Sequence, residues 1–338
     1  MPSPTPFSDP ANLLALVRAQ FSPSAASVRH LSGERDLNFL VDFEVGKGAP
    51  SAPARCVLKV SDPKENPAAL ALQNAALDHL AVHAPQLPVQ RLYRWNDGAH
   101  LWPLPGPDGI GYARLLGYLP GRPLHEAPSS PAQRHSVGAA LGALDQALAG
   151  FAHPVVGNEA LMWDIHRTPE LQAWLPAIQD AQSRAWGEAV FGRYVQEVQP
   201  LLPTLAQQYL HNDFNPYNLL VDPAQPDAVC GVLDFGDMVY GPRVFDAAVA
   251  VSYQGLEGGE ASVVSMRDFM RGYQRANPLQ ERELRLVPLL AAVRCAMTLC
   301  ITEQRAQWFP ENRAYILRNH AVATAGLRAL MAHGLDVL

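Results

Sequence analysis

The N-terminal third of the chain combines short apolar runs with one long helical pattern. Residues 55–60 form an apolar, β-branched run typical of a half-buried strand, and Lys59 lies within it. Residues 67–80 repeat their apolar positions at helical spacing, and Gln73 falls on the inward side of that pattern. The segment 115–121 ends another strand-like run with glycine and proline, which favours a turn or hinge. We therefore expect a small β-rich region with one main helix.

Helical patterns dominate the rest of the chain. The longest apolar stretch, 286–302, is interrupted by Arg294, so we do not expect it to cross a membrane. Proline-rich loops such as 127–131 separate the helical segments, and Pro131 suits the first turn of a helix. These patterns predict an N-terminal lobe over 1–116, a hinge over 117–121 and a mainly helical lobe over 122–338.

Composition agrees with a cytoplasmic enzyme but does not indicate its chemistry. Of the 338 residues 17% are charged, and the net charge is −6. This charged fraction is below the roughly 25% of typical soluble domains, and the acidic balance argues against nucleic acid as a partner. The four cysteines form no CxxC pair, and the N-terminus lacks a basic region followed by an apolar core. We expect reduced thiols, no signal peptide, no membrane association and a cytoplasmic location, with the oligomeric state left open.

The candidate chemistry is concentrated in the motif H-N-D-F-N-P-Y-N at 211–218 and in the D-F-G that begins at Asp234. Asn218 follows Asp213 by five residues, and Asp234 follows a second apolar run. Phosphoryl transfer from a nucleotide needs one carboxylate that orients the attacking hydroxyl and accepts its proton. It also needs amide and carboxylate oxygens that hold magnesium. An isolated H-x-D often marks only a turn or helix cap, but this order of residues matches a kinase catalytic loop and metal-binding turn. We therefore interpret the two motifs as a kinase active site, carried on a polar hairpin whose loop is residues 222–227.

A kinase also needs groups that hold the nucleotide, and the N-terminal lobe offers them. Lys59 is placed to contact phosphates, with Gln73 as a neutral partner in place of the usual glutamate. A polar turn with Ser32 stands where a phosphate-covering hairpin is expected, although it has one glycine and no GxGxxG. Backbone groups of the hinge would contact the base. The predicted nucleotide-binding residues are Lys59, Ser32, Gln73, Leu116, Tyr118 and Leu119.

Further motifs lie along nearly the whole chain, at residues 32–39, 118–121, 163–164, 211–218, 234–242 and 310–315. Together they resemble the aminoglycoside phosphotransferase and choline kinase group. The catalytic loop and the Asp234 turn are specific to that large group, in which glycine more often stands at the position of Asn212. The continuation G-D-M-V-Y-G-P at 236–242 and P-E-N at 310–312 are most similar to the hydroxylysine kinase branch.

This resemblance implies an α+β, two-lobed, protein-kinase-like fold. A small N-terminal antiparallel β lobe with one main helix would precede a larger, mainly α-helical C-terminal lobe. The resemblance implies that Asp213 is the catalytic base and that Asn218 and Asp234 are magnesium ligands. It also implies that Lys59 binds phosphate and that His211 and Asp246 support the loop. The implied phosphoryl donor is ATP or GTP, bound with Mg²⁺.

The acceptor pocket is expected in the helical lobe, where carboxylates stand next to aromatic residues. Such groups can hold a cationic amine, although each also fits core packing, turn capping or a solvated helix face. An amino-acid acceptor would in addition need a cation for its carboxylate, for which Arg243 and Arg305 are candidates. The candidate acceptor-binding residues are Asp237, Trp163, Asp164 and Glu303.

We therefore predict a kinase that transfers the γ-phosphoryl group of ATP or GTP to a hydroxyl of a small amine or amino-acid-like acceptor, with 5-hydroxylysine as the first candidate. Aminoglycosides, choline, ethanolamine and homoserine are alternative acceptors within the same fold. A kinase-like fold that only binds, without catalysis, is a further alternative.

Overall fold

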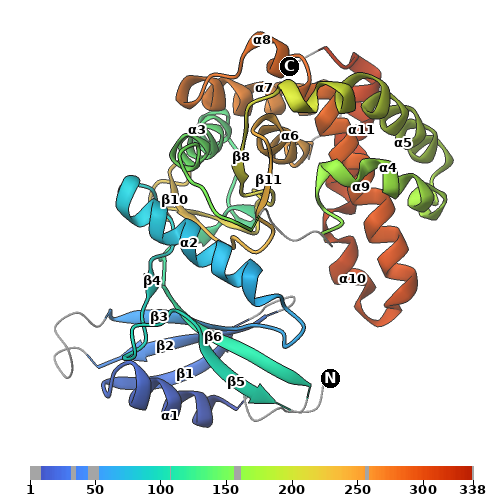
Figure 1. Ribbon diagram of the computed structural model, residues 1–338. Helices are drawn as coiled ribbons and strands as arrows, with labels where there is room; N and C mark the ends of the chain where they lie inside the picture. Colours follow the sequence, from blue (N-terminus) through green and yellow to red (C-terminus); the bar gives the residue numbers. More distant parts are fainter. Residues whose placement is uncertain are drawn as a thin grey trace. The chain divides into compact units, whose positions relative to one another are not determined.

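The computed structural model describes residues 9–31, 36–44, 53–106, 108–155, 161–255 and 259–336. The chain divides into two compact units, Met1–Pro120 (unit 1) and Gly121–Leu338 (unit 2) (Figure 1). Unit 1 is an antiparallel sheet with two helices, and unit 2 is mainly helical with short strand pairs. The α+β class predicted from the sequence is confirmed.

The sheet of unit 1 has the strand order β1-β2-β3-β6-β4, and every neighbouring pair is antiparallel. Strand β5 pairs with the first half of β6, while β4 pairs with its second half. The strands are β1 (Ala25–Leu31), β2 (Leu37–Phe43), β3 (Arg55–Val60), β4 (Leu92–Tyr93), β5 (Trp102–Gly106) and β6 (Gly109–Gly117), and the helices are α1 (Pro10–Gln20) and α2 (Pro67–His83).

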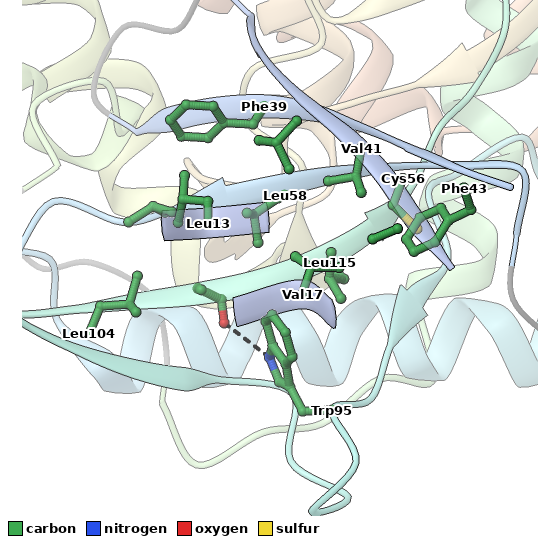
Figure 2. Packing of buried hydrophobic residues seen from close by; sticks show 14 residues of the cluster. Leu13, Val17, Phe39, Val41, Phe43, Cys56, Leu58, Trp95, Leu104 and Leu115 are labelled. Atoms are coloured by element: carbon green, nitrogen blue, oxygen red, sulfur yellow. Dashed lines mark hydrogen bonds between the residues drawn. The ribbon is translucent and has the colours of Figure 1, made fainter. Parts of the chain in front are cut away.

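The alternation along β3 separates the two faces of this sheet. Cys56, Leu58 and Val60 are buried in a core that includes residues of α1, and Lys59 therefore lies on the opposite face. Figure 2 shows this core, in which the indole N–H of Trp95 donates to the carbonyl oxygen of Ala113 at 3.3 Å. Helix α2 covers the Lys59 face, because its side chains bond to β6 residues of that face.

Three helices start on the same local signature, a polar capping residue followed by proline. The capping side chain accepts a hydrogen bond from a backbone N–H of the first turn, and proline suits the first helical position because it needs no N–H partner there. The capping residues are Asp9 for α1, Asn66 for α2 and Ser130 for α3 (Pro131–Leu148).

Unit 2 is organised around α9 (Val287–Trp308), which is buried over most of its length. Helices α5, α6 and α11 pack against it. By length and composition Glu281–Trp308 could cross a membrane, but most of its apolar window is buried inside the structure, as in a core helix. The other helices are α4 (Thr168–Leu171), α5 (Ala181–Arg193), α6 (Val244–Ser252), α7 (Gly259–Ala276), α8 (Glu281–Leu284), α10 (Arg313–Ile316) and α11 (His320–His333).

Two glycines bring α3 and α7 into close contact. A Cβ atom on Gly138 would lie 2.0 Å from the carbonyl oxygen of Phe269, and one on Gly272 would lie 1.9 Å from that of His135. Only hydrogen at these positions lets the two backbones approach so closely.

A two-stranded and a three-stranded sheet in unit 2 frame the motifs that carry the candidate chemistry. Strand β8 (Gln207–Leu210) pairs with β11 (Val239–Pro242), and β9 (Leu219–Val221) lies between β10 (Val229–Val232) and β7 (Arg122–Pro123). Residues 211–218 therefore form the loop from β8 to β9, and residues 233–238 form the turn from β10 to β11. Leu219, which follows the loop, pairs with Val232, which precedes the turn. The end of the loop therefore lies beside the start of the turn.

Candidate active site

The carboxylate of Asp213 is held in the β8–β9 loop by two side-chain amides. Asn215 donates to one carboxylate oxygen at 2.7 Å, and Asn218 donates to the other at 2.7 Å. Asn212, just before it, adopts a left-handed backbone with φ 62°. Asparagine tolerates this conformation better than most residues, which explains how it can replace the glycine that is more frequent there.

Asp246 fixes the backbone at the start of this loop. It is fully buried in the first turn of α6, and its two carboxylate oxygens accept the N–H groups of His211 and Asn212, each at 2.7 Å. A carboxylate that accepts two backbone N–H groups makes charge-assisted bonds of fixed geometry. The loop conformation is thus tied to the helical core.

Behind Asp246 lies a second buried carboxyl group, that of Asp145 on α3. Burial raises the pKa of Asp145 well above its ordinary value, and the negative charge of Asp246 adds to this effect. One oxygen of Asp145 accepts the Tyr273 hydroxyl at 2.6 Å, and the other has no donor among the described residues. Both effects on its pKa favour the protonated form of Asp145, in which the carboxyl group can act as a hydrogen-bond donor toward Asp246.

His211 connects the loop to the strand that precedes Asp234. Its Nδ1 accepts the N–H of Asp213 at 3.3 Å, so its Nε2 carries the proton that is donated to the Leu233 carbonyl at 3.0 Å. The Leu233 N–H in turn donates to the Asn218 carbonyl at 2.8 Å. The residue before Asp234 is therefore bonded to both ends of the catalytic loop.

Asn218 and Asp234 supply the oxygen ligands that magnesium prefers. The side-chain N–H₂ of Asn218 points to Asp213, which leaves its carbonyl oxygen on the other side of the amide. Asp234 is exposed, has φ 57°, and accepts the Gly236 N–H at 3.1 Å with one oxygen. Among the described residues no group of three or more His, Cys, Asp or Glu side chains could hold a metal ion. Two protein ligands fit a magnesium ion that takes its remaining ligands from phosphates and water.

Negative charge is crowded around Asp213. The pKa of Asp213 is raised to about 7, mainly by burial and also by the negative charges of Asp237 and Asp234, while Arg294 and the bond from Asn215 act in the opposite direction. A divalent cation bound among these groups would relieve the repulsion, so the charge pattern also fits a metal.

Arg294 is the buried cation of this site, and the sequence interpretation did not assign it a role. It is 1% exposed on α9, donates to the carbonyl groups of Trp163 and Asn212, and lies 5.1 Å from the centroid of the Trp163 ring. Arg294 thereby joins the predicted acceptor residue Trp163 to the residue before Asp213. A lone arginine in an apolar stretch was the available signal, because a buried charge requires partners.

Lys59 lies on the face of the sheet that α2 covers, but the pairing expected for it differs. Lys59 forms an ion pair with Asp36 at 3.1 Å. Gln73, expected opposite Lys59, instead accepts a bond from Arg114 at 2.6 Å, and the neighbouring Asn74 accepts another from Arg114 at 3.2 Å. Arg114 stands directly beside Lys59 in the register of β6 and β3, so it reaches the helix from the next strand.

The remaining nucleotide-binding candidates are at or near the end of β6. Leu116 is a buried strand residue, while Tyr118 lies beyond the strand with its ring 4.7 Å from the guanidinium of Arg55. Leu119 is half-buried. Ser32 lies outside the described residues.

The predicted acceptor residues separate into two groups. The carbonyl of Asp237 accepts a hydrogen bond from the Asn212 side chain of the 211–218 loop at 3.1 Å, and Trp163 is linked to the same residue through Arg294. The carboxylate of Asp164 instead accepts hydrogen bonds from the backbone N–H and from the ring N–H of His166. Glu303 accepts the Gln179 N–H at 2.9 Å and pairs with His320 at 2.8 Å. These contacts connect the segment before α5 to the start of α11.

The candidate cation Arg243 has a structural role. Its guanidinium pairs with the buried carboxylate of Glu283 at 2.7 Å and also bonds to Asn277 and to the Pro278 carbonyl. These contacts fix the start of α6 to the segment before α8.

Comparison with known proteins gives consistent results. A model of the phosphotransferase enzyme family matches residues 28–284. Hydroxylysine kinase of Danio rerio is 30% identical, with 93% of this chain and 88% of that protein covered. Hydroxylysine kinase of Mus musculus is 28% identical, with 91% and 85% covered.

Solved structures share the fold. A microcompartment-associated aminopropanol kinase has a TM-score of 0.69 at 18% identity, covering 93% of this chain and 95% of its own. An amicoumacin kinase in complex with AMP-PNP, Ca²⁺ and Ami has a TM-score of 0.67 at 16% identity, covering 96% and 97%.

Proposed function

The chain belongs to the phosphotransferase enzyme family, and we propose that it transfers the γ-phosphoryl group of ATP or GTP to the hydroxyl of 5-hydroxylysine. That it is a small-molecule kinase acting on a hydroxyl acceptor follows from the family and its relatives. The choice of acceptor rests on hydroxylysine kinases of two vertebrates that match it over at least nine-tenths of its length.

The observation that supports the chemistry best is the way Asp213 is held. Both of its oxygens are oriented by amide donors, and its raised pKa suits a group that accepts a proton near neutral pH. In the proposed reaction the acceptor oxygen attacks the γ-phosphorus, the bond to the nucleoside diphosphate breaks, and Asp213 takes the hydroxyl proton. Orientation of the hydroxyl by a fixed carboxylate provides much of the acceleration in such reactions.

Asn218 and Asp234 are the residues proposed to hold Mg²⁺. A metal held there would supply positive charge to neutralise the phosphate groups of the nucleotide. In unit 1, Lys59 is proposed to contact phosphate, and the end of β6 to contact the base. A cytoplasmic location is also part of the proposal, and it agrees with four free cysteines, three of them buried.

The test is a coupled assay of nucleoside-diphosphate release with ATP and with GTP in magnesium. The acceptors are 5-hydroxylysine, homoserine, ethanolamine, choline and an aminoglycoside. We expect strong release with 5-hydroxylysine. Release with another acceptor alone would keep the kinase chemistry and reject the proposed acceptor, and silence with all of them would favour the non-catalytic alternative.

Asp213→Asn provides the matched test of mechanism. We expect turnover to fall by about 100-fold or more, the usual scale for loss of a general base, while magnesium-nucleotide affinity by calorimetry stays within about threefold. Asp222→Asn is the control, since this carboxylate only accepts a turn N–H in the hairpin loop. Turnover close to wild type in Asp213→Asn would remove Asp213 from its role.

A further inference from the structure

A stacked arginine lies against the catalytic loop, and the proposed chemistry does not use it. Arg318 is in the 3₁₀ turn Leu317–Asn319 that joins α10 to α11. Its guanidinium is 3.9 Å from the ring centroid of Tyr315 and 5.2 Å from that of Tyr217. His125 stacks on Tyr217 as well, at 4.2 Å. Tyr315 ends the P-E-N-R-A-Y motif at 310–315, and Arg318 follows it by three residues, so this segment brings an aromatic ring and an arginine to one place.

Tyr217 ties this cluster to the reacting carboxylate. It lies between Asp213 and Asn218 in the catalytic loop, and its N–H donates to the Asn215 side chain at 2.8 Å. The same Asn215 side chain donates to Asp213. Arg318 is therefore stacked on a residue of the segment that fixes the proposed base and metal ligand.

A buried phenol gives an independent indication that these charges are close together. Burial raises the pKa of Tyr253, while Arg294 and Arg318 oppose this rise and Asp213 adds to it. Tyr253 is thus within electrostatic range of both Arg318 and Asp213. All of these groups belong to unit 2, so their proximity is a property of that unit alone.

The stacking suits Arg318 to carboxylate recognition. Contacts with two aromatic rings restrict the guanidinium of Arg318, and the N–H groups of a guanidinium match a carboxylate in a two-bond arrangement. The two tyrosine contacts also reduce the side-chain entropy lost when a ligand binds. A simple amino alcohol or an aminoglycoside has no carboxylate to occupy such a group, whereas an amino acid has one.

We propose that Arg318 binds the α-carboxylate of an amino-acid acceptor and so selects amino acids over simple amino alcohols. This inference rests on the proposed kinase function and deepens it by naming a specificity residue. It assigns to Arg318 the role that the sequence suggested for Arg243, whose guanidinium bonds to Glu283, Asn277 and Pro278.

The experiment compares two acceptors that differ only in the carboxylate, 5-hydroxylysine and 1,5-diaminopentan-2-ol. Steady-state kinetics are measured for wild type, Arg318→Met, Arg318→Lys and the control Arg285→Met. Arg285 is a suitable control because its side chain is 75% exposed and pairs only with Glu281 on the surface among the described contacts. Thermal unfolding of each variant verifies folding, and Arg318→Lys serves if the methionine variant unfolds.

For Arg318→Met we expect the KM for 5-hydroxylysine to rise about 10- to 100-fold, the effect of losing hydrogen bonds between charged groups, with kcat within about threefold. The KM for 1,5-diaminopentan-2-ol should not change, and the lysine variant should lie between. An equal rise for both acceptors, or no rise for either, would overturn the inference. So would a wild type that uses both acceptors equally well, although the kinase function would then stand. Silence of wild type with both acceptors would overturn both.

Discussion

Replacing Asp145 by asparagine should make the stability of unit 2 less dependent on pH. The carboxyl group of Asp145 is fully buried between Asp246 and Tyr273, and its pKa is raised well above the ordinary value by burial and by the charge of Asp246. Asparagine has the same shape. Its N–H₂ can donate to Asp246 and its oxygen can accept from Tyr273, so both hydrogen bonds are kept without a titrating proton.

The sign follows from the proton balance. The unfolded chain releases the Asp145 proton near pH 4, whereas the folded chain keeps it until its raised pKa is reached. The folded state therefore binds the extra proton, and its stabilising effect is complete below about pH 4 and is lost as pH rises. Between the unfolded and the folded pKa of Asp145, each pH unit lowers the free energy of unfolding of wild type by about 1.4 kcal/mol. Asp145→Asn has no titrating proton at this position and loses nothing through it.

The assay is urea unfolding at pH 5, 6 and 7, followed by circular dichroism, whose helical signal comes mainly from unit 2. Over the part of this range that lies below the raised pKa of Asp145, the variant should gain stability relative to wild type with the slope given above. Asp180→Asn is the control. Its pKa is lowered by the bonds from Ser183, so its contribution is lost only at more acid pH and its difference from wild type should stay constant from pH 5 to 7. A constant difference for Asp145→Asn as well would show that Asp145 is ionised in the folded protein and refute the reasoning.

Four further substitutions test separate parts of the structure. Gly272→Ala places a Cβ 1.9 Å from a backbone oxygen and should destabilise unit 2 by about 3 kcal/mol. Gly192→Ala, with nothing within 4 Å, should stabilise it by about 0.5 kcal/mol, and equal melting temperatures in calorimetry would contradict this. Arg294→Met leaves buried carbonyl groups and carboxylates without their cation and should lower the free energy of urea unfolding by about 3 kcal/mol; a loss below about 1 kcal/mol would contradict its role. Asp234→Ala should weaken magnesium-nucleotide binding about tenfold or more in a calorimetric titration, and an unaltered affinity would count against the metal assignment.

Local patterns predicted the elements that have local causes. The apolar, β-branched run around Lys59 predicted β3, the helical spacing around Gln73 predicted α2, and the proline after Ser130 predicted a helix start, all of which the structure contains. The α+β class followed from the same patterns together with the family resemblance. In each case a few neighbouring residues determine the backbone conformation.

Partners distant in sequence could not be predicted in this way. The sequence placed Gln73 on the inward face of its helix, but only the sheet register shows that Arg114, on the strand next to Lys59, is its partner. Likewise, Glu303 was a reasonable acceptor candidate, yet the packing of α9 places it against Gln179 and His320. Periodicity indicates which face of an element is buried, whereas the identity of the facing element depends on the whole fold.

The catalytic loop illustrates why the site could be found by motif while its support could not. Asn212 in the left-handed region costs about 1 kcal/mol, and the two N–H bonds to Asp246 each contribute about 1.5–3 kcal/mol as bonds to a charged group. The support therefore outweighs the strain several-fold. It comes from α3, α6, α7 and α9, through Asp145, Asp246, Tyr273 and Arg294. All of these residues belong to unit 2, so the described contacts that orient Asp213 are internal to that unit.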